Sequence, residues 1–210
     1  MVLLVERRST STPSALGDEG GTEGDLLARA RGGNLFAFEE IVKRYQRRVY
    51  GVALRIVRRH DVADDVAQEA FIRAYQALDR FDPSRPFGPW ICRIAANLAV
   101  NHVRSPEARE SPLPEGHGET PAAGADPLGA VLERESREVL EAALATLPAQ
   151  QRAVLVLRAV EGLSYREIAD SLGISPGTVM SRLFRARERL AIALSPYLGA
   201  AARRAHGDGS

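Results

Sequence analysis

Apolar residues recur at intervals of three and four along most of the chain, the period of an amphipathic α-helix, and strand-like alternation is scarce. In the first half this pattern predicts three long helices. The first follows an N-cap at Asn34, the second an N-cap at Asp61, and the third has Pro89 in its first turn. Their predicted buried stripes are Phe38, Ile41, Val42, Tyr45, Val49 and Val52; Val62, Val66, Ala70, Ala74 and Leu78; and Trp90, Ile91, Ile94, Leu98 and Val103.

The second half has the same helical character. One predicted helix carries Val139, Leu140, Ala143, Leu144 and Leu147. Pro148 begins another, which holds Val154, Leu155 and Leu157 and stops at Gly162. The pattern therefore predicts an all-α protein.

Two stretches lack the apolar residues that a folded core needs. Residues 8–24 are rich in Ser, Thr and Gly, and residues 105–127 contain several prolines, which break helices and strands. A loop as long as the second one indicates a linker between domains. We therefore expect two small helical domains joined by a flexible linker: a tail at 1–24, a domain at 25–104, the linker at 105–132, a domain at 133–197 and a tail at 198–210.

The segment EIADSLGISPGTVMSRLFRARERL (167–190) has the pattern of a helix-turn-helix. Ser164 is the predicted N-cap of the first helix, with Glu167 as its capping-box partner. Gly173 can adopt the left-handed conformation that ends this helix, and Ser175 can cap the second. The second helix buries Val179, Leu183, Ala186 and Leu190. In such motifs it enters the major groove of DNA.

Arginines on the second helix suit this geometry. Arg182, Arg185 and Arg189 are spaced by three and four residues, away from the apolar stripe. A guanidinium donates two parallel hydrogen bonds to guanine edges or phosphates. The helix N-terminus between Ser175 and Thr178 offers backbone donors to a phosphate. Phe184 either contacts a thymine methyl group or packs beneath the first helix; the pattern leaves both readings open.

Composition limits the other functions. The net charge is +1, from 28 basic and 27 acidic residues, so total charge neither supports nor excludes a nucleic-acid partner. The single cysteine, Cys92, allows no internal disulfide and is typical of a small core residue.

The opening MVLLVERR has the reverse charge order of a signal peptide and is too short to span a membrane, so we expect a cytoplasmic protein without membrane insertion.

Two long segments resemble one protein family. Residues 140–190, from LEAALATLPAQQ to RARERL, resemble the C-terminal domain of bacterial sigma factors of the extracytoplasmic-function group. Residues 64–105, DDVAQEAFIRAYQALDRFDPSRPFGPWICRIAANLAVNHVRS, resemble the N-terminal domain of the same group. Response-regulator output domains share the C-terminal motif, but the two domains in this order are far more specific.

The resemblance implies a subunit that directs core RNA polymerase to promoters and helps to melt them. It places Asp65, Gln68 and Glu69 on the face that docks on the polymerase. It assigns residues 80–103 to the −10 element, with Asn97 at the pocket for a flipped base. By spacing, the donors on this helix face are Arg93, Asn97, Asn101 and Arg104. Phe87 and Trp90 could stack on bases, but core packing is favoured.

In the C-terminal domain the resemblance implies contacts to the −35 element. The matching positions are Met180, Ser181, Phe184 and Arg185, with Arg182 alongside. The family usually has Lys or Arg where this chain has Met180, so one cationic contact is expected to be absent. The family's promoter-spacer domain is replaced by the linker, which is expected to thread toward the RNA exit path. Members of the group are commonly held inactive by an anti-sigma partner, so we expect one here.

Two other functions fit parts of the pattern. A repressor or activator would bind duplex DNA tightly without polymerase, and a helical adaptor would use its arginines to bind an acidic protein. No nucleophile–base set, glycine-rich phosphate loop or His/Cys cluster is recognisable in the sequence. We therefore expect no enzymatic activity, no metal and no cofactor.

Overall fold

The computed structural model describes residues 21–105 and 127–206, and every regular element in these ranges is helical. The N-terminal helices are α1 (Glu23–Arg31), α2 (Leu35–Val57), α3 (His60–Gln76) and α4 (Phe87–Arg104), with a 3₁₀ turn, η1 (Leu78–Arg80), after α3. The C-terminal helices are α6 (Pro127–Ala145), α7 (Ala149–Ala159), α8 (Tyr165–Leu172) and α9 (Pro176–His206). The all-α prediction is confirmed.

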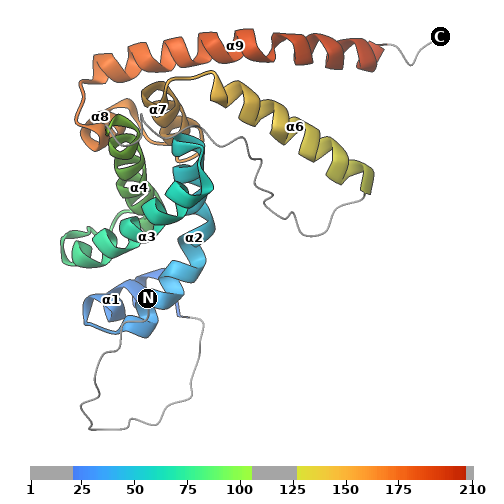
Figure 1. Cartoon of the computed structure of the whole chain (residues 1–210). Helices are drawn as coiled ribbons and strands as arrows, with labels where there is room; N and C mark the ends of the chain where they lie inside the picture. The colour runs from blue at the N-terminus through green and yellow to red at the C-terminus, as the bar shows by residue number, and fades with distance from the viewer. Residues whose placement is uncertain (1–20, 106–126, 207–210) are drawn as a thin grey trace.

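Helices α2, α3 and α4 form the body of the N-terminal half, and α1 packs on α2 (Figure 1). The predicted stripes of α2 and α3 face this core: Ile41, Val49, Val52 and Ala70 are fully buried. On α4 only Ile91 of the predicted stripe is fully buried; Trp90, Ile94, Leu98 and Val103 are half-buried at its edge. Phe87 is also fully buried, and Trp90, half-buried, packs against both Phe81 and Phe87 with ring centroids 4.9 and 5.4 Å apart. The favoured reading of Phe87 and Trp90 as core residues therefore holds.

Helix starts are mostly where the sequence places them. Asn34 caps α2 by accepting a hydrogen bond from the Ala37 amide at 3.1 Å. The predicted cap at Asp61 is wrong: α3 begins one residue earlier, at His60, after Arg59. The carboxylate of Asp61 instead pairs with the guanidinium of Arg59 at 2.5 Å, which competes with capping.

Three helices extend beyond the limits drawn from the sequence. Helix α1 begins at Glu23, so the last two residues of the tail predicted at 1–24 are helical. Helix α6 begins at Pro127, within the stretch assigned to the linker, so its first six residues are helical rather than linker. Helix α9 continues through Pro196 to His206, into the predicted C-terminal tail. The prolines and small residues in these stretches suggested irregular chain, but a proline is tolerated at the first position of a helix, where Pro127 lies. Residues 1–20 of the tail predicted at 1–24, and residues 106–126 of the predicted linker, lie outside the described residues.

The two halves are packed together rather than separated. Helix α7 lies against α2 and α4, and α8 lies against α4. Buried residues of α7, α8 and α9, including Val154, Leu157, Ile168 and Leu183, belong to the same apolar cluster as the core of α1–α4. The sequence treated the halves as independent bodies because hydrophobic periodicity reports which face of a helix is buried but not what covers it.

Candidate nucleic-acid interface

Helices α8 and α9 form the predicted helix-turn-helix. The Ser164 hydroxyl accepts from the Glu167 amide, and the Glu167 carboxylate accepts from the Ser164 amide at 2.9 Å, so the capping box is complete. Gly173 has φ +60° and ψ 40°, the left-handed conformation that a side chain would strain. The Thr178 amide then donates to the Ser175 hydroxyl at 3.1 Å and starts α9. These local bonds set the angle between the two helices.

One face of α9 packs inward and the opposite face is open. Val179 and Leu183 are buried with residues of α7 and α8, and Ala186 is buried with Leu144 and Leu147, as predicted. Leu190, also predicted to be buried, is half-buried. Met180 is 59 % exposed and Phe184 68 % exposed, so Phe184 does not pack beneath α8. Ser181, Arg185 and Arg189 are exposed as well. Helix α9 therefore presents an exposed surface with both polar and apolar side chains, which are the groups that contact base edges in a DNA groove.

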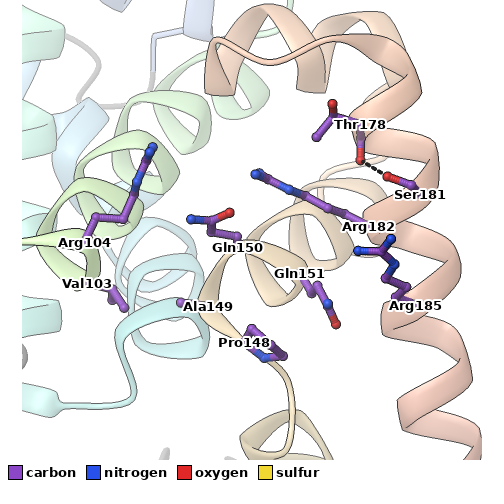
Figure 2. Close-up of a pocket in the computed structure, with 10 residues that line it drawn as sticks. All are labelled: Val103, Arg104, Pro148, Ala149, Gln150, Gln151, Thr178, Ser181, Arg182 and Arg185. Carbon is purple, nitrogen blue, oxygen red and sulfur yellow. Dashed lines mark hydrogen bonds between the residues drawn. The ribbon is translucent and has the colours of Figure 1, made fainter.

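Arg182 differs from Arg185 and Arg189 because it is half-buried at a cleft. The cleft, of about 610 Å³, lies between α4, α7 and α9 and is lined by Arg104, Gln150, Gln151, Thr178, Ser181, Arg182 and Arg185, among others (Figure 2). Burial, and secondarily the nearby Arg104, lowers the pKa of Arg182 from its ordinary value. Arg104 is predicted to contact the −10 element and Arg182 the −35 element, yet both line the same cleft.

The polar face of α4 is only partly open. Asn101 and Arg104 are exposed, whereas Arg93 and Asn97 are half-buried. The Arg93 guanidinium donates to the Ser171 hydroxyl of α8 at 2.7 Å. The four predicted donors thus share a helix but not an environment, because Arg93 is bonded to α8 whereas Asn101 and Arg104 remain exposed.

On α3, Asp65 and Gln68 are exposed and Glu69 is half-exposed, opposite the buried Val66 and Ala70. The Glu69 carboxylate pairs with Arg73, four residues along, at 2.6 Å. Gln68 also borders a groove of about 370 Å³ between α2 and α3, whose α2 side includes Gln46, Arg47 and Tyr50. The sequence analysis did not identify the α2 residues of this groove. The signal that could have identified them is that they are polar and lie opposite the buried stripe of α2.

The comparisons with known proteins cover both halves of the chain. Residues 41–109 match the family described as Sigma-70 region 2, and residues 137–190 match Sigma-70, region 4. The chain is 39 % identical over 181 residues to the RNA polymerase sigma-H factor of Pseudomonas aeruginosa, covering 82 % of this chain and 94 % of that protein. It belongs to the extracytoplasmic-function group of the sigma-70 family.

Further relatives agree with this family. The ECF RNA polymerase sigma-E factor of Escherichia coli K12 is 36 % identical over 185 residues, covering 84 % of this chain and 96 % of that protein. Among solved structures, CnrH in complex with the cytosolic domain of CnrY matches with a TM-score of 0.53 at 30 % identity, over 83 % of this chain and 97 % of CnrH. The sigma factor RpoE of Bartonella quintana, in complex with the anti-sigma factor NepR, matches with a TM-score of 0.58 at 26 % identity, over 75 % and 96 %.

As an alternative sigma factor, the protein directs RNA polymerase to promoters. Within the described residues, no helix has the length and apolarity needed to cross a bilayer.

Proposed function

We propose that the exposed face of α9 reads the −35 element of the promoters that this sigma factor selects. The supporting observation is the division of α9 into a buried stripe and an open face that carries Met180, Phe184 and Arg185. The outward residues supply one guanidinium fork for a base edge or phosphate, and an aromatic ring for a thymine methyl group. Ser175, Thr178 and Ser181 lie toward the N-terminus of the same helix, where polar groups can hold a phosphate. Arg182 and Arg189 add positive charge on either side.

The −10 element is assigned to α4. Asn97, Asn101 and Arg104, with Arg93 once it is freed from Ser171, provide hydrogen-bond donors along one side of the helix for an unstacked strand and its phosphates. The opposite side of the helix, including Ala95, Ala96 and Ala99, is fully buried and holds the helix in place. Capture of a base that has left the stack favours the melted promoter over the duplex, which is how a protein without enzymatic activity assists opening.

Core RNA polymerase is assigned to the exposed face of α3, Asp65 with Gln68 and Glu69, and to the adjoining groove between α2 and α3. The groove adds Arg47 and Tyr50 to the acidic and amide groups of α3. Such a mixed polar surface, bordering an apolar floor at Phe71, suits a specific but reversible protein contact.

An anti-sigma factor is the proposed negative regulator. The solved structure of the sigma factor RpoE from Bartonella quintana, which resembles this chain, contains the anti-sigma factor NepR. We further propose that the protein contributes no catalytic step and no cofactor of its own, and that it acts in the cytoplasm with its polymerase.

Run-off transcription with purified core polymerase tests the proposal. Adding the protein should produce discrete start sites, and mapping them should reveal shared motifs near −10 and −35. Tight, sequence-specific duplex binding without polymerase would favour a repressor or activator. Failure to direct any start site would favour an adaptor.

The polymerase face has a separate test. The double variant D65A/Q68A should lose co-purification with core polymerase while its helical circular dichroism is unchanged, because both side chains are exposed. The matched control is D79A, an exposed carboxylate in η1 that lies outside the proposed face. Unchanged co-purification of D65A/Q68A would contradict the assignment.

A further inference from the structure

The cleft of about 610 Å³ between α4, α7 and α9 is lined by basic and amide side chains, and no Asp or Glu is among the described residues that line it. Arg104 comes from α4, and Arg182 and Arg185 come from α9. Figure 2 shows Arg104 and Arg182 extending from their helices toward the space between them, close to Gln150. Within residues 21–105 and 127–206, no ion pair joins any of the three arginines to a carboxylate. The cleft therefore concentrates positive charge that the described residues do not neutralise.

The N-terminus of α7 opens on the same cleft. Pro148, Ala149 and Gln150 line it, and no side chain of the described residues caps this end of the helix. The first turn of α7 also contains no acidic residue. The first backbone N–H groups of a helix have no intrahelical acceptor and carry partial positive charge, so they bind anions. Three guanidinium groups and a helix N-terminus thus face one space.

The position of Arg182 is not explained by DNA contact alone. Burial lowers the pKa of Arg182, and the positive charge of Arg104 lowers it further. A helix that reads a DNA groove needs arginines on its open face, which Arg185 supplies; it does not need Arg182 half-buried between α4 and α7. Like charges that share a cleft repel, and a bound anion would replace this repulsion with attraction.

Gln151 supplies a separate observation. It lines the cleft, and its Oε1 atom is buried without a hydrogen-bond partner among the described residues. Buried polar atoms are nearly always paired with protein, water or a ligand. A carbonyl oxygen cannot donate to a phosphate, but it accepts from a hydroxyl or amino group. The cleft therefore offers several donors to phosphates and one acceptor to another part of the same molecule.

We propose that this cleft binds a small phosphorylated molecule that carries two or more phosphate groups. The guanidinium groups of Arg104, Arg182 and Arg185 pair with the phosphates, and the N-terminus of α7 binds one of them. Gln151 accepts a hydrogen bond from a hydroxyl or amino group of the same molecule. The cleft has a volume typical of small-molecule sites.

The bound molecule would compete with promoter DNA, because the same three arginines are the proposed promoter contacts. Only this consequence rests on the assignment of α4 and α9 to the two promoter elements. Binding of the phosphates themselves does not depend on it.

Isothermal titration calorimetry of the full-length protein tests the site, with inorganic tripolyphosphate and ATP as probes and no divalent cation present. We expect tripolyphosphate to bind as one molecule per chain. Tighter binding of ATP would show that a nucleoside adds contacts such as the one offered by Gln151. Equal affinities would show that the phosphates alone are recognised, and either result supports a phosphate site.

Variants of the arginines locate the bound probe. Arg182→Ala and Arg104→Ala should each weaken tripolyphosphate binding about tenfold or more, because each removes a hydrogen-bonded charge. Arg182→Lys, which keeps the charge but loses the planar fork, should lie between wild type and Arg182→Ala. Arg187→Ala is the matched control, since Arg187 is exposed on α9 and does not line the cleft. It should bind the probe as wild type does.

Gln150→Glu separates loss of the site from loss of the fold. A carboxylate in the first turn of α7 favours the helix, so the thermal unfolding midpoint should not fall. The same carboxylate lies at the cleft and should weaken tripolyphosphate binding about tenfold or more, because it repels the phosphates and pairs with the arginines.

Three results would overturn the proposal. The first is no binding of either probe, including the case in which promoter duplex binds but the probes do not, which would leave the arginines to DNA alone. The second is several probe molecules per chain, and the third is equal weakening by Arg187→Ala; both would mean diffuse attraction to a basic surface. The titrations with phosphate probes involve no promoter, so failure of the −10 and −35 assignments would appear only in the transcription assays.

Discussion

The Arg152 guanidinium, six per cent exposed, donates to the carbonyl of Ile56 at 3.1 Å, across 96 residues of sequence. Within the described residues no salt bridge joins it to a carboxylate; its acceptors are the backbone carbonyls of Ile56 and Leu144, at the ends of α2 and α6, and of Leu147, just after α6. Burial lowers the pKa of Arg152 to about 10, with Arg58 contributing repulsion. The charge nevertheless remains present at neutral pH, so it binds these carbonyls as a cation.

Replacing Arg152 with Ala should therefore destabilise the protein. Several buried carbonyls would lose their donors, and we expect the free energy of unfolding to fall by about 2–4 kcal/mol. Urea denaturation followed by circular dichroism measures this. The control Arg187→Ala, at an exposed position of α9, should change it by less than about 0.5 kcal/mol. Equal unfolding midpoints for the two variants would contradict the role of Arg152.

The capping box of α8 predicts an acid-sensitive contribution to stability. The Ser164 amide and hydroxyl hold the pKa of Glu167 below its ordinary value of 4.5. Because the folded-state pKa is lowered, this stabilisation is present above pH 4.5 and is lost as the pH falls through the folded value. In Glu167→Gln the free energy of unfolding should depend less on pH in that acid range. Ser164→Ala should cost about 1 kcal/mol at pH 7; an unaltered pH profile in Glu167→Gln would exclude this explanation.

Arg185→Ala tests base reading by α9. If the guanidinium contacts a base edge, discrimination at one −35 position should fall by roughly 1–3 kcal/mol while other positions keep their preference. Holoenzyme binding to a set of promoters with single base changes measures this. Uniform weakening across all sequences would show that Arg185 contacts only the phosphate backbone.

Met180→Lys tests the departure from the family pattern on the same helix. Met180 is exposed, so the substitution should not disturb the fold. A new phosphate contact would make holoenzyme binding tighter and steepen its salt dependence by about one counterion. Binding titrations at several salt concentrations, with Met180→Gln as the uncharged control, measure the slope. An identical slope for both variants would place residue 180 away from the phosphates.

Asn97→Ala tests base capture by α4. Loss of one hydrogen bond to the base is expected to slow open-complex formation by about five- to tenfold, from about 1–1.5 kcal/mol per hydrogen bond, with a smaller effect on initial promoter binding. Permanganate reactivity of unpaired thymines and filter binding separate the two steps. Equal losses in both steps would argue against a pocket for a flipped base.

Several features of the fold follow from short-range rules and could be predicted. The helices, the caps at Asn34, Ser164 and Ser175, and the left-handed Gly173 each depend on residues within one or two turns. The same rules placed Leu183 inward and Arg185 outward. The family resemblance, rather than spacing, supplied the partners and the functional assignment of each face.

The sequence by itself therefore determined the helices, the helix-turn-helix and the residues that each helix turns outward, because these depend on periodicity and local hydrogen bonds. Only the tertiary structure decided that the halves pack together, that Arg48 meets Glu161 and Arg152 meets Ile56, and that Arg93 is engaged by Ser171. These partners lie 78 to 113 residues apart. No local pattern distinguishes an arginine that will be solvated from one that will be buried against a distant carbonyl or carboxylate, since the difference lies in what the rest of the chain places over it.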